Sequence, residues 1–164
     1  MSQPVQDPAF WAERLAKAET QHHAVYRCTL EKWMEIAERH RALLARVVQP
    51  TWKVLDAGCG WGRLLNLLPN DWHGEYIGVD ISPDFVQLAR VTYPGREFVC
   101  WDLKEFSKYK PQIEADICIT VSLRRMIIRE YGEAEWQRML NALRIRALRF
   151  LHLEYDEPDG ELEC

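Results

Sequence analysis

Three acidic residues and three closely spaced glycines are the residues of this chain whose types and spacing could do chemistry. Asp56 ends a short apolar run, and Gly58, Gly60 and Gly62 follow it at alternate positions. A glycine turn after a strand lets a ligand lie against the main chain, because no Cβ stands in the way. When a helix follows the turn, its first N–H groups face the ligand as well. The pattern therefore predicts a strand, a bared turn and a helix that bind a ligand together.

The spacing of the glycines excludes one common ligand class. The dinucleotide fingerprint G-x-G-x-x-G needs its third glycine for close packing of helix on strand. Counted from Gly58, that third position is Arg63, so the fingerprint fails. The observed pattern is D-x-G-x-G-x-G, which turns the interpretation away from nicotinamide cofactors.

Two further acids follow apolar runs later in the chain. Asp80 ends the run that begins at Glu75, and it lies 18 residues beyond Gly62. A spacing of about 20 residues is expected for the acid that follows the second strand of such a unit, where a carboxylate accepts hydrogen bonds from ribose hydroxyls. Asp102 ends a third run, and residues 116–122 form a fourth.

In this order the four segments resemble the motifs of the class I S-adenosylmethionine (SAM) dependent methyltransferases, over roughly residues 50–155. The resemblance implies SAM as the cofactor and S-adenosylhomocysteine as the product. It places Asp56 near the methionine ammonium, Asp80 on the ribose, Ile81 beneath the adenine and Asp102 on the adenine amino group. The residues expected to bind the cofactor are Asp56, Gly58, Cys59, Gly60, Trp61, Gly62, Asp80, Ile81, Trp101, Asp102, Leu103, Val121 and Trp11.

Several of these positions keep a second interpretation. Asp102 could equally cap a helix that starts near Lys104, and Trp101 could belong to the core. Trp11 belongs to an aromatic group near the N-terminus that resembles the helical lid of many small-molecule methyltransferases, although aromatic residues at helical spacing more often pack in a core. Arg63 is expected to face solvent or a nearby acid.

The elements that must position these residues alternate along the chain. Periodicity predicts strands near 53–57, 75–80, 96–101, 116–121 and 148–155. Helices are predicted near 10–18, 29–48, 61–68, 83–92 and 133–146, with a further one within 122–131. Strand–helix alternation predicts an α/β fold, a three-layer Rossmann-like sandwich around a mostly parallel five-stranded sheet with N-terminal helices. Residues 1–48 are predicted as a helical cap and residues 49–164 as the SAM-binding domain, in one compact unit.

The C-terminal end of the sheet is expected to be shortened. The methyltransferase fold usually adds two strands after the fifth, whereas only eight residues with Pro158 and Gly160 follow Asp156. The sheet is therefore predicted to end at the apolar strand 148–155. A bare apolar edge invites pairing, so we expect either a homodimer through this strand or cover by the N-terminal helices.

Composition narrows the class of protein. The chain has 164 residues, of which 48% are hydrophobic and 28% charged, as in ordinary globular domains. A net charge of −4 gives no reason to expect nucleic acid as the dominant partner. No window resembles a membrane span or a secretory signal. The five cysteines are scattered without a C-x-x-C pair, which indicates reduced thiols, a cytoplasmic setting and no metal site.

The acceptor side of the reaction carries weaker signals. The segment after the fourth strand faces the reactive methyl group in this fold, and it offers Ser122 and Arg125 as catalytic candidates beside Tyr26 and His23. We expect a methyltransferase with a small-molecule acceptor that works by in-line transfer, positioning and desolvation. The alternatives are a SAM-binding module without catalysis, acting as a regulatory subunit or cofactor sink, and another SAM-consuming reaction.

Overall fold

A single twisted sheet organises the part of the chain that the structure, a computed structural model, describes: residues 8–17, 29–108, 113–154 and 161–163. Its strand order is β3-β2-β1-β4-β5-β6. The strands are β1 (Val54–Ala57), β2 (Tyr76–Asp80), β3 (Glu97–Cys100), β4 (Ile117–Val121), β5 (Phe150–Leu153) and β6 (Glu161–Glu163). The first five run parallel, which confirms the predicted Rossmann-like α/β fold.

The order of the strands creates a crevice at one edge of the sheet. Val54 of β1 pairs with Tyr76 of β2 on one side and with Ile117 of β4 on the other. The chain therefore leaves the centre first toward β2 and later toward β4. Where successive crossovers diverge in this way, the carboxyl ends of the central strands border a space that α/β proteins use for ligands.

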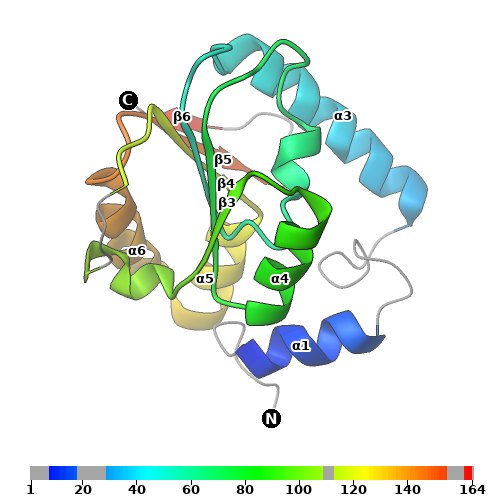
Figure 1. The fold of residues 1–164 in the computed structure, drawn as a ribbon. Coiled ribbons are helices and arrows are strands. Elements are labelled where there is room, and N and C mark those ends of the chain that lie inside the picture. Colours follow the sequence, from blue (N-terminus) through cyan, green and yellow to red (C-terminus); the bar gives the residue numbers. More distant parts are fainter. Residues whose placement is uncertain (1–7, 18–28, 109–112, 155–160, 164) are drawn as a thin grey trace.

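Helices cover both faces of the sheet (Figure 1). One face carries α3 (Leu30–Val47), the 3₁₀ turn η1 (Arg63–Asn66) and α4 (Pro83–Thr92), and the other carries η2 (Leu103–Lys108), α5 (Leu123–Tyr131) and α6 (Glu133–Arg144). The short helix α1 (Pro8–Lys17) lies against α4. The strands β1, β2, β4 and β5 are buried along almost their whole length. Strands buried on both faces have continuous apolar runs, and these runs predicted the four strands from the sequence.

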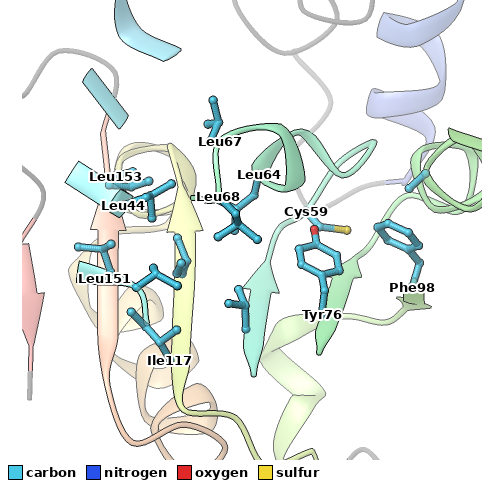
Figure 2. Packing of buried hydrophobic residues seen from close by; sticks show 14 of the residues in the cluster. Leu44, Cys59, Leu64, Leu67, Leu68, Tyr76, Phe98, Ile117, Leu151 and Leu153 are labelled. Atoms are coloured by element: carbon cyan, nitrogen blue, oxygen red, sulfur yellow. The ribbon is translucent and has the colours of Figure 1, made fainter. Parts of the chain in front are cut away.

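Two separate clusters of side chains fill the layers. Leu44 of α3 and Leu64 of η1 share a cluster with Ile119 and Leu151 of the sheet, part of which Figure 2 shows. On the opposite face, Leu143 of α6 packs with Leu55 and other strand residues. Within the predicted N-terminal cap, α3 therefore contributes directly to the main core. None of the described helices is long and apolar enough to cross a bilayer.

The starts of two helices follow the chemistry of their caps. The Thr29 hydroxyl accepts the Lys32 N–H at 3.3 Å before α3, and the Ser82 hydroxyl accepts the Phe85 N–H at 3.3 Å before α4. Pro83 occupies the first turn of α4, where its fixed φ suits the helix. The predicted helix over 83–92 is confirmed at both ends.

The helix predicted near 61–68 is wrong, because only η1 forms there. Gly62, with φ of 86°, holds a left-handed conformation immediately before it. Pro69 follows Leu68 and disfavours the helical conformation at that residue, while its ring leaves no N–H for a helix to use. The crossover from β1 to β2, residues 58–75, therefore contains a 3₁₀ turn in place of the predicted helix.

The expectation that the sheet ends at 148–155 is also wrong. The short strand β6 pairs antiparallel with β5, with Leu162 opposite Leu151. Three residues suffice for this ladder, and Pro158 and Gly160 lie outside the described residues. The regular strand begins only at Phe150, and Leu148 is 74% exposed before it. In the described chain β5 is thus no edge strand, and the bare edge that motivated the homodimer is occupied.

Candidate functional site

A solvent-connected cavity lies at the carboxyl edge of the sheet, and the space inside it, open solvent included, is about 690 Å³. Most of its wall is apolar. Eight of the residues predicted to bind a cofactor line it: Trp11, Gly58, Gly60, Asp80, Ile81, Asp102, Leu103 and Val121. Ser122 lines it too, together with residues that the sequence analysis did not single out: Phe85, Leu123, Met126, Ile127 and Met139.

The glycine turn forms one wall of this cavity. The N–H groups of Gly58 and Cys59 donate to the Val79 carbonyl at 2.8 and 3.1 Å, which pins the turn to β2. Gly60 has a φ of 52°, and a Cβ built on it would meet no atom within 4 Å. At this position the main chain is therefore bared toward open space, as a turn that takes a ligand requires.

Asp80 is held firmly at the cavity wall. Its Oδ2 accepts the Gly60 N–H at 2.8 Å and its Oδ1 accepts the Ser82 N–H at 2.9 Å. Burial raises the pKa of this carboxyl, while the backbone hydrogen bonds act in the opposite direction. Each carboxylate oxygen has a second lone pair, so Asp80 can still accept hydrogen bonds from a ligand.

A smaller chamber of about 330 Å³ adjoins the cavity, since both share Gly58, Gly60 and Val121 as lining residues. Its other lining residues are Asp56, Cys59, Trp61, Arg63 and Leu64. Arg63 is buried here, and it acts on Asp56 by lowering the pKa of that carboxyl. Of the two environments expected for Arg63, the structure thus shows the nearby acid.

Asp56 itself is almost completely buried under the glycine turn. Its Oδ2 accepts the Tyr76 hydroxyl proton at 2.6 Å. Burial raises the pKa of Asp56 to about 7, and this effect exceeds the opposing effects of the Tyr76 hydrogen bond and Arg63. The chamber therefore combines a carboxyl that titrates near neutral pH with a guanidinium.

Aromatic side chains cover one side of the cavity. Trp11 of α1 lies against Phe85 of α4 with ring centroids 5.9 Å apart, and Phe85 lies 6.1 Å from Trp61 of the glycine turn. The three residues form one buried cluster. Through it α1 is docked on both α4 and the turn. Trp11 is packed in a buried cluster, as the core interpretation predicts, and also lines the cavity.

The start of α5 has an unusual backbone. Ser122 is the one residue other than glycine with a positive φ (58°) among the described residues. Its N–H donates to the Leu153 carbonyl at 2.7 Å, but its side chain makes no capping bond to the helix. Instead the Glu154 carboxylate, at the end of β5, accepts the Arg125 N–H at 3.1 Å. The Glu154 carboxylate, which follows β5, thus caps the start of α5 in place of the Ser122 hydroxyl.

The remaining predicted residues are less central. Asp102 lines the cavity, and its Oδ1 accepts the Lys104 N–H at 2.9 Å at the start of η2, as the cap interpretation predicts. Gly62 lines neither space, and a Cβ there would meet the Tyr93 ring at 3.0 Å. Trp101 is 37% exposed and lines neither space.

Among the catalytic candidates, Arg125 lines neither space, and Tyr26 and His23 lie outside the described residues. In the described parts of the chain, no group of His, Cys, Asp or Glu residues is arranged to hold a metal ion. The additional apolar lining residues could not be found from the sequence, because their helical spacing indicates only burial.

The fold and the site together define a class of protein. A glycine turn after β1 and a carboxylate after β2, at the crevice of a parallel sheet, are typical of Rossmann-like proteins that bind nucleotides. Residues 54–145 match the methyltransferase domain family. The chain belongs to this family, as its motifs indicated.

Individual relatives agree with this assignment. The chain is 37% identical over 86 residues to a trans-aconitate 2-methyltransferase from Enterobacter sp. (strain 638), a match that covers 49% of this chain and 33% of the relative. The curated relatives are matched over 28–33% of their own length.

Solved structures share the fold. A TehB-like SAM-dependent methyltransferase from Corynebacterium glutamicum superposes with a TM-score of 0.57 at 19% identity, covering 89% of this chain and 73% of that one. Magnesium protoporphyrin IX methyltransferase from Synechocystis, solved with bound SAM, gives 0.59 at 21% identity, covering 88% and 68%.

Proposed function

We propose that this chain binds SAM and catalyses transfer of its methyl group to a small molecule. The observation that carries the proposal is the cavity at the carboxyl edge, where the bared Gly60 backbone faces the fixed Asp80 carboxylate. A trans-aconitate methyltransferase acts, by its name, on a small molecule, which supports the acceptor class.

The two adjoining spaces match the two ends of the cofactor. The larger cavity suits the nucleoside, with Asp80 on the ribose hydroxyls and Asp102 on the adenine amino group, and Ile81 and Leu103 supply apolar surface for the ring. The smaller chamber suits the amino-acid end, because its ammonium complements Asp56 and its carboxylate complements Arg63. Cys59 and Trp61 form part of the same wall.

In this reaction the protein would mainly position the acceptor next to the methyl group and surround both with apolar side chains. Bound SAM supplies an electrophilic methyl group on a sulfonium centre. The aromatic and methionine side chains of Trp11, Phe85 and Met126 provide an apolar wall for the site. Holding a nucleophile in line at near-attack distance in such a site lowers the barrier without a strong base. An acceptor atom that carries a proton, such as an amine nitrogen, would release it to solvent, whereas a carboxylate acceptor would have none to release.

Calorimetry with SAM and with S-adenosylhomocysteine tests the binding half of the proposal. Wild type is expected to bind both ligands, and Asp80→Ala is expected to bind about 10-fold or more weakly, since hydrogen bonds to a charged group contribute about 1.5–3 kcal/mol. Asp71→Ala, which removes an exposed acid that lines neither space, is the matched control. If wild type binds neither ligand, the proposal is wrong.

The catalytic half needs an acceptor panel. Protein is incubated with SAM and candidate small acceptors, carboxylic acids among them, while formation of S-adenosylhomocysteine is followed. We expect acceptor-dependent product that Asp80→Ala reduces. Tight cofactor binding with no product from any acceptor would contradict the assignment as an enzyme.

A further inference from the structure

Ser122 holds a backbone conformation that its residue type disfavours. Every other described residue with a positive φ is a glycine: Gly58, Gly60, Gly62, Gly95 and Gly132. A side chain in the left-handed region is strained, and such strain persists where the surrounding structure enforces it, often at ligand sites. Here the Ser122 N–H bond to the Leu153 carbonyl, at 2.7 Å, holds the backbone in place. A glycine would adopt the same conformation more easily, so the serine needs another reason.

The hydroxyl of Ser122 is not used within the described structure. Serine at the start of a helix normally caps it, but the Glu154 carboxylate already accepts the Arg125 N–H that such a cap would take. The Ser122 Oγ is shielded from water and has no hydrogen-bond partner among the described residues. Rotation about its Cα–Cβ bond carries the hydroxyl between three staggered positions, and no hydrogen bond is lost by that rotation.

The position of Ser122 indicates which ligand its hydroxyl would meet. Ser122 lines the larger cavity, together with Asp80 and Asp102, and does not line the smaller chamber that holds Asp56 and Arg63. We infer that Ser122 is a cofactor-binding residue whose hydroxyl hydrogen-bonds the nucleoside part of the ligand. This inference rests on the proposed function, and it assigns the serine to binding rather than to removal of a proton from the acceptor.

The two substitutions Ser122→Gly and Ser122→Ala test this assignment, with calorimetry of S-adenosylhomocysteine and of adenosine. A lost hydrogen bond to a neutral group corresponds to roughly 2- to 12-fold weaker binding, and we expect this loss for both ligands in both variants. Because glycine accepts the positive φ without strain, Ser122→Gly is expected to melt at or above the temperature of wild type. Lower affinity in a protein that is no less stable is a result that a merely structural role would not produce.

Thr29→Ala provides the matched control, because it removes a hydroxyl that does cap a helix, at the start of α3. It is expected to lower the melting temperature and leave the affinity for S-adenosylhomocysteine unchanged. Wild-type affinity of Ser122→Gly for both ligands would overturn the inference. Weaker binding of S-adenosylhomocysteine with unchanged binding of adenosine would overturn it as well, because the contact would then lie at the amino-acid end. Absence of binding by wild type would instead refute the proposed function on which it rests.

Discussion

At the scale of single residues, Asp56 makes the protein sensitive to pH. Its pKa is raised to about 7 by burial, whereas an aspartate in an unfolded chain titrates near 3.9. Between about pH 4 and pH 7 the folded protein therefore keeps a proton that the unfolded chain has released. Stability from this group is fully present below about pH 4 and is lost as the pH rises toward 7.

Asp56→Asn is expected to remove this dependence, because the amide oxygen still accepts the Tyr76 hydroxyl proton but cannot ionise. Urea unfolding at pH 4.5, 5.5 and 6.5 measures the effect as the difference between wild type and variant. We expect the free energy of unfolding of wild type to fall relative to that of Asp56→Asn as the pH rises, by at most about 1.4 kcal/mol per pH unit. Parallel profiles for the two proteins would contradict the assignment.

His40 acts in the opposite direction and must be separated from Asp56. Burial and the nearby Arg63 lower the pKa of His40 to about 4, while the Glu154 carbonyl accepts its Nε2–H at 3.2 Å. Stability from His40 is present above about pH 6.5 and is lost as the pH falls toward 4. Both proteins of the comparison contain His40, so its contribution cancels in the difference.

At the scale of elements, removal of the Glu154 cap from the start of α5 is expected to lower the free energy of unfolding. Glu154→Ala is expected to destabilise the fold by about 0.5–2 kcal/mol, the range for loss of a helix cap. Glu154→Gln retains an oxygen that can accept the Arg125 N–H and should lose less. Urea unfolding of the two variants at one pH checks the order. Equal losses would mean that the negative charge, rather than the hydrogen bond, supports the start of α5.

Helix α1 is expected to contribute to ligand affinity through one side chain. Trp11→Ala removes the ring that lines the cavity against Phe85, and we predict several-fold weaker binding of S-adenosylhomocysteine by calorimetry. Leu15→Ala is the matched control, since Leu15 packs in the same cluster but does not line the cavity. If both variants bind S-adenosylhomocysteine equally weakly, α1 affects the affinity only through its packing on the rest of the protein, and the Trp11 ring makes no separate contribution.

The elements show where sequence reasoning succeeds. Helix α4 was predicted to the residue, because Ser82 and Pro83 are local start signals whose chemistry does not depend on the rest of the fold. The turn η1 was overpredicted as a helix, because its leucines have helical spacing while the left-handed Gly62 and the following Pro69 limit it. Strand β6 was missed because its three residues are too few to show an alternating pattern, and because Pro158 and Gly160 before it indicate a turn.

The site was predictable in part for the same reasons. The residues that follow β1 and end β2 could be identified from the sequence by their types and spacing, and Gly60 and Asp80 do line the cavity. Met139 of α6 reaches it from the far end of the chain, and periodicity could only indicate that it is buried. The positive φ of Ser122 and its replacement as a cap by Glu154 arise from tertiary contacts that no local pattern encodes.

At the scale of the whole molecule, we expect β6 to protect the sheet from association, because it pairs with β5 at the edge. Removal of residues 161–164 would leave the N–H and C=O groups of β5 unpaired along an apolar strand, which invites pairing with a second chain. The truncated chain is expected to form dimers or larger species at concentrations where the full chain does not. Light scattering over a concentration series measures this, and identical masses for the two proteins would contradict it.

The central position of β1 has a consequence for the order in which the molecule forms. Val54 meets Ile117 only after the whole intervening crossover has been made, and the Ser122 N–H finds its partner only in Leu153. Pairings so distant along the chain close slowly. The glycine turn is synthesised before the cavity residues Val121 and Ser122 and before the Leu153 carbonyl that holds Ser122. The cavity can therefore form only once the chain has been made as far as β5, and a chain interrupted before that point holds the glycine motif without the cavity.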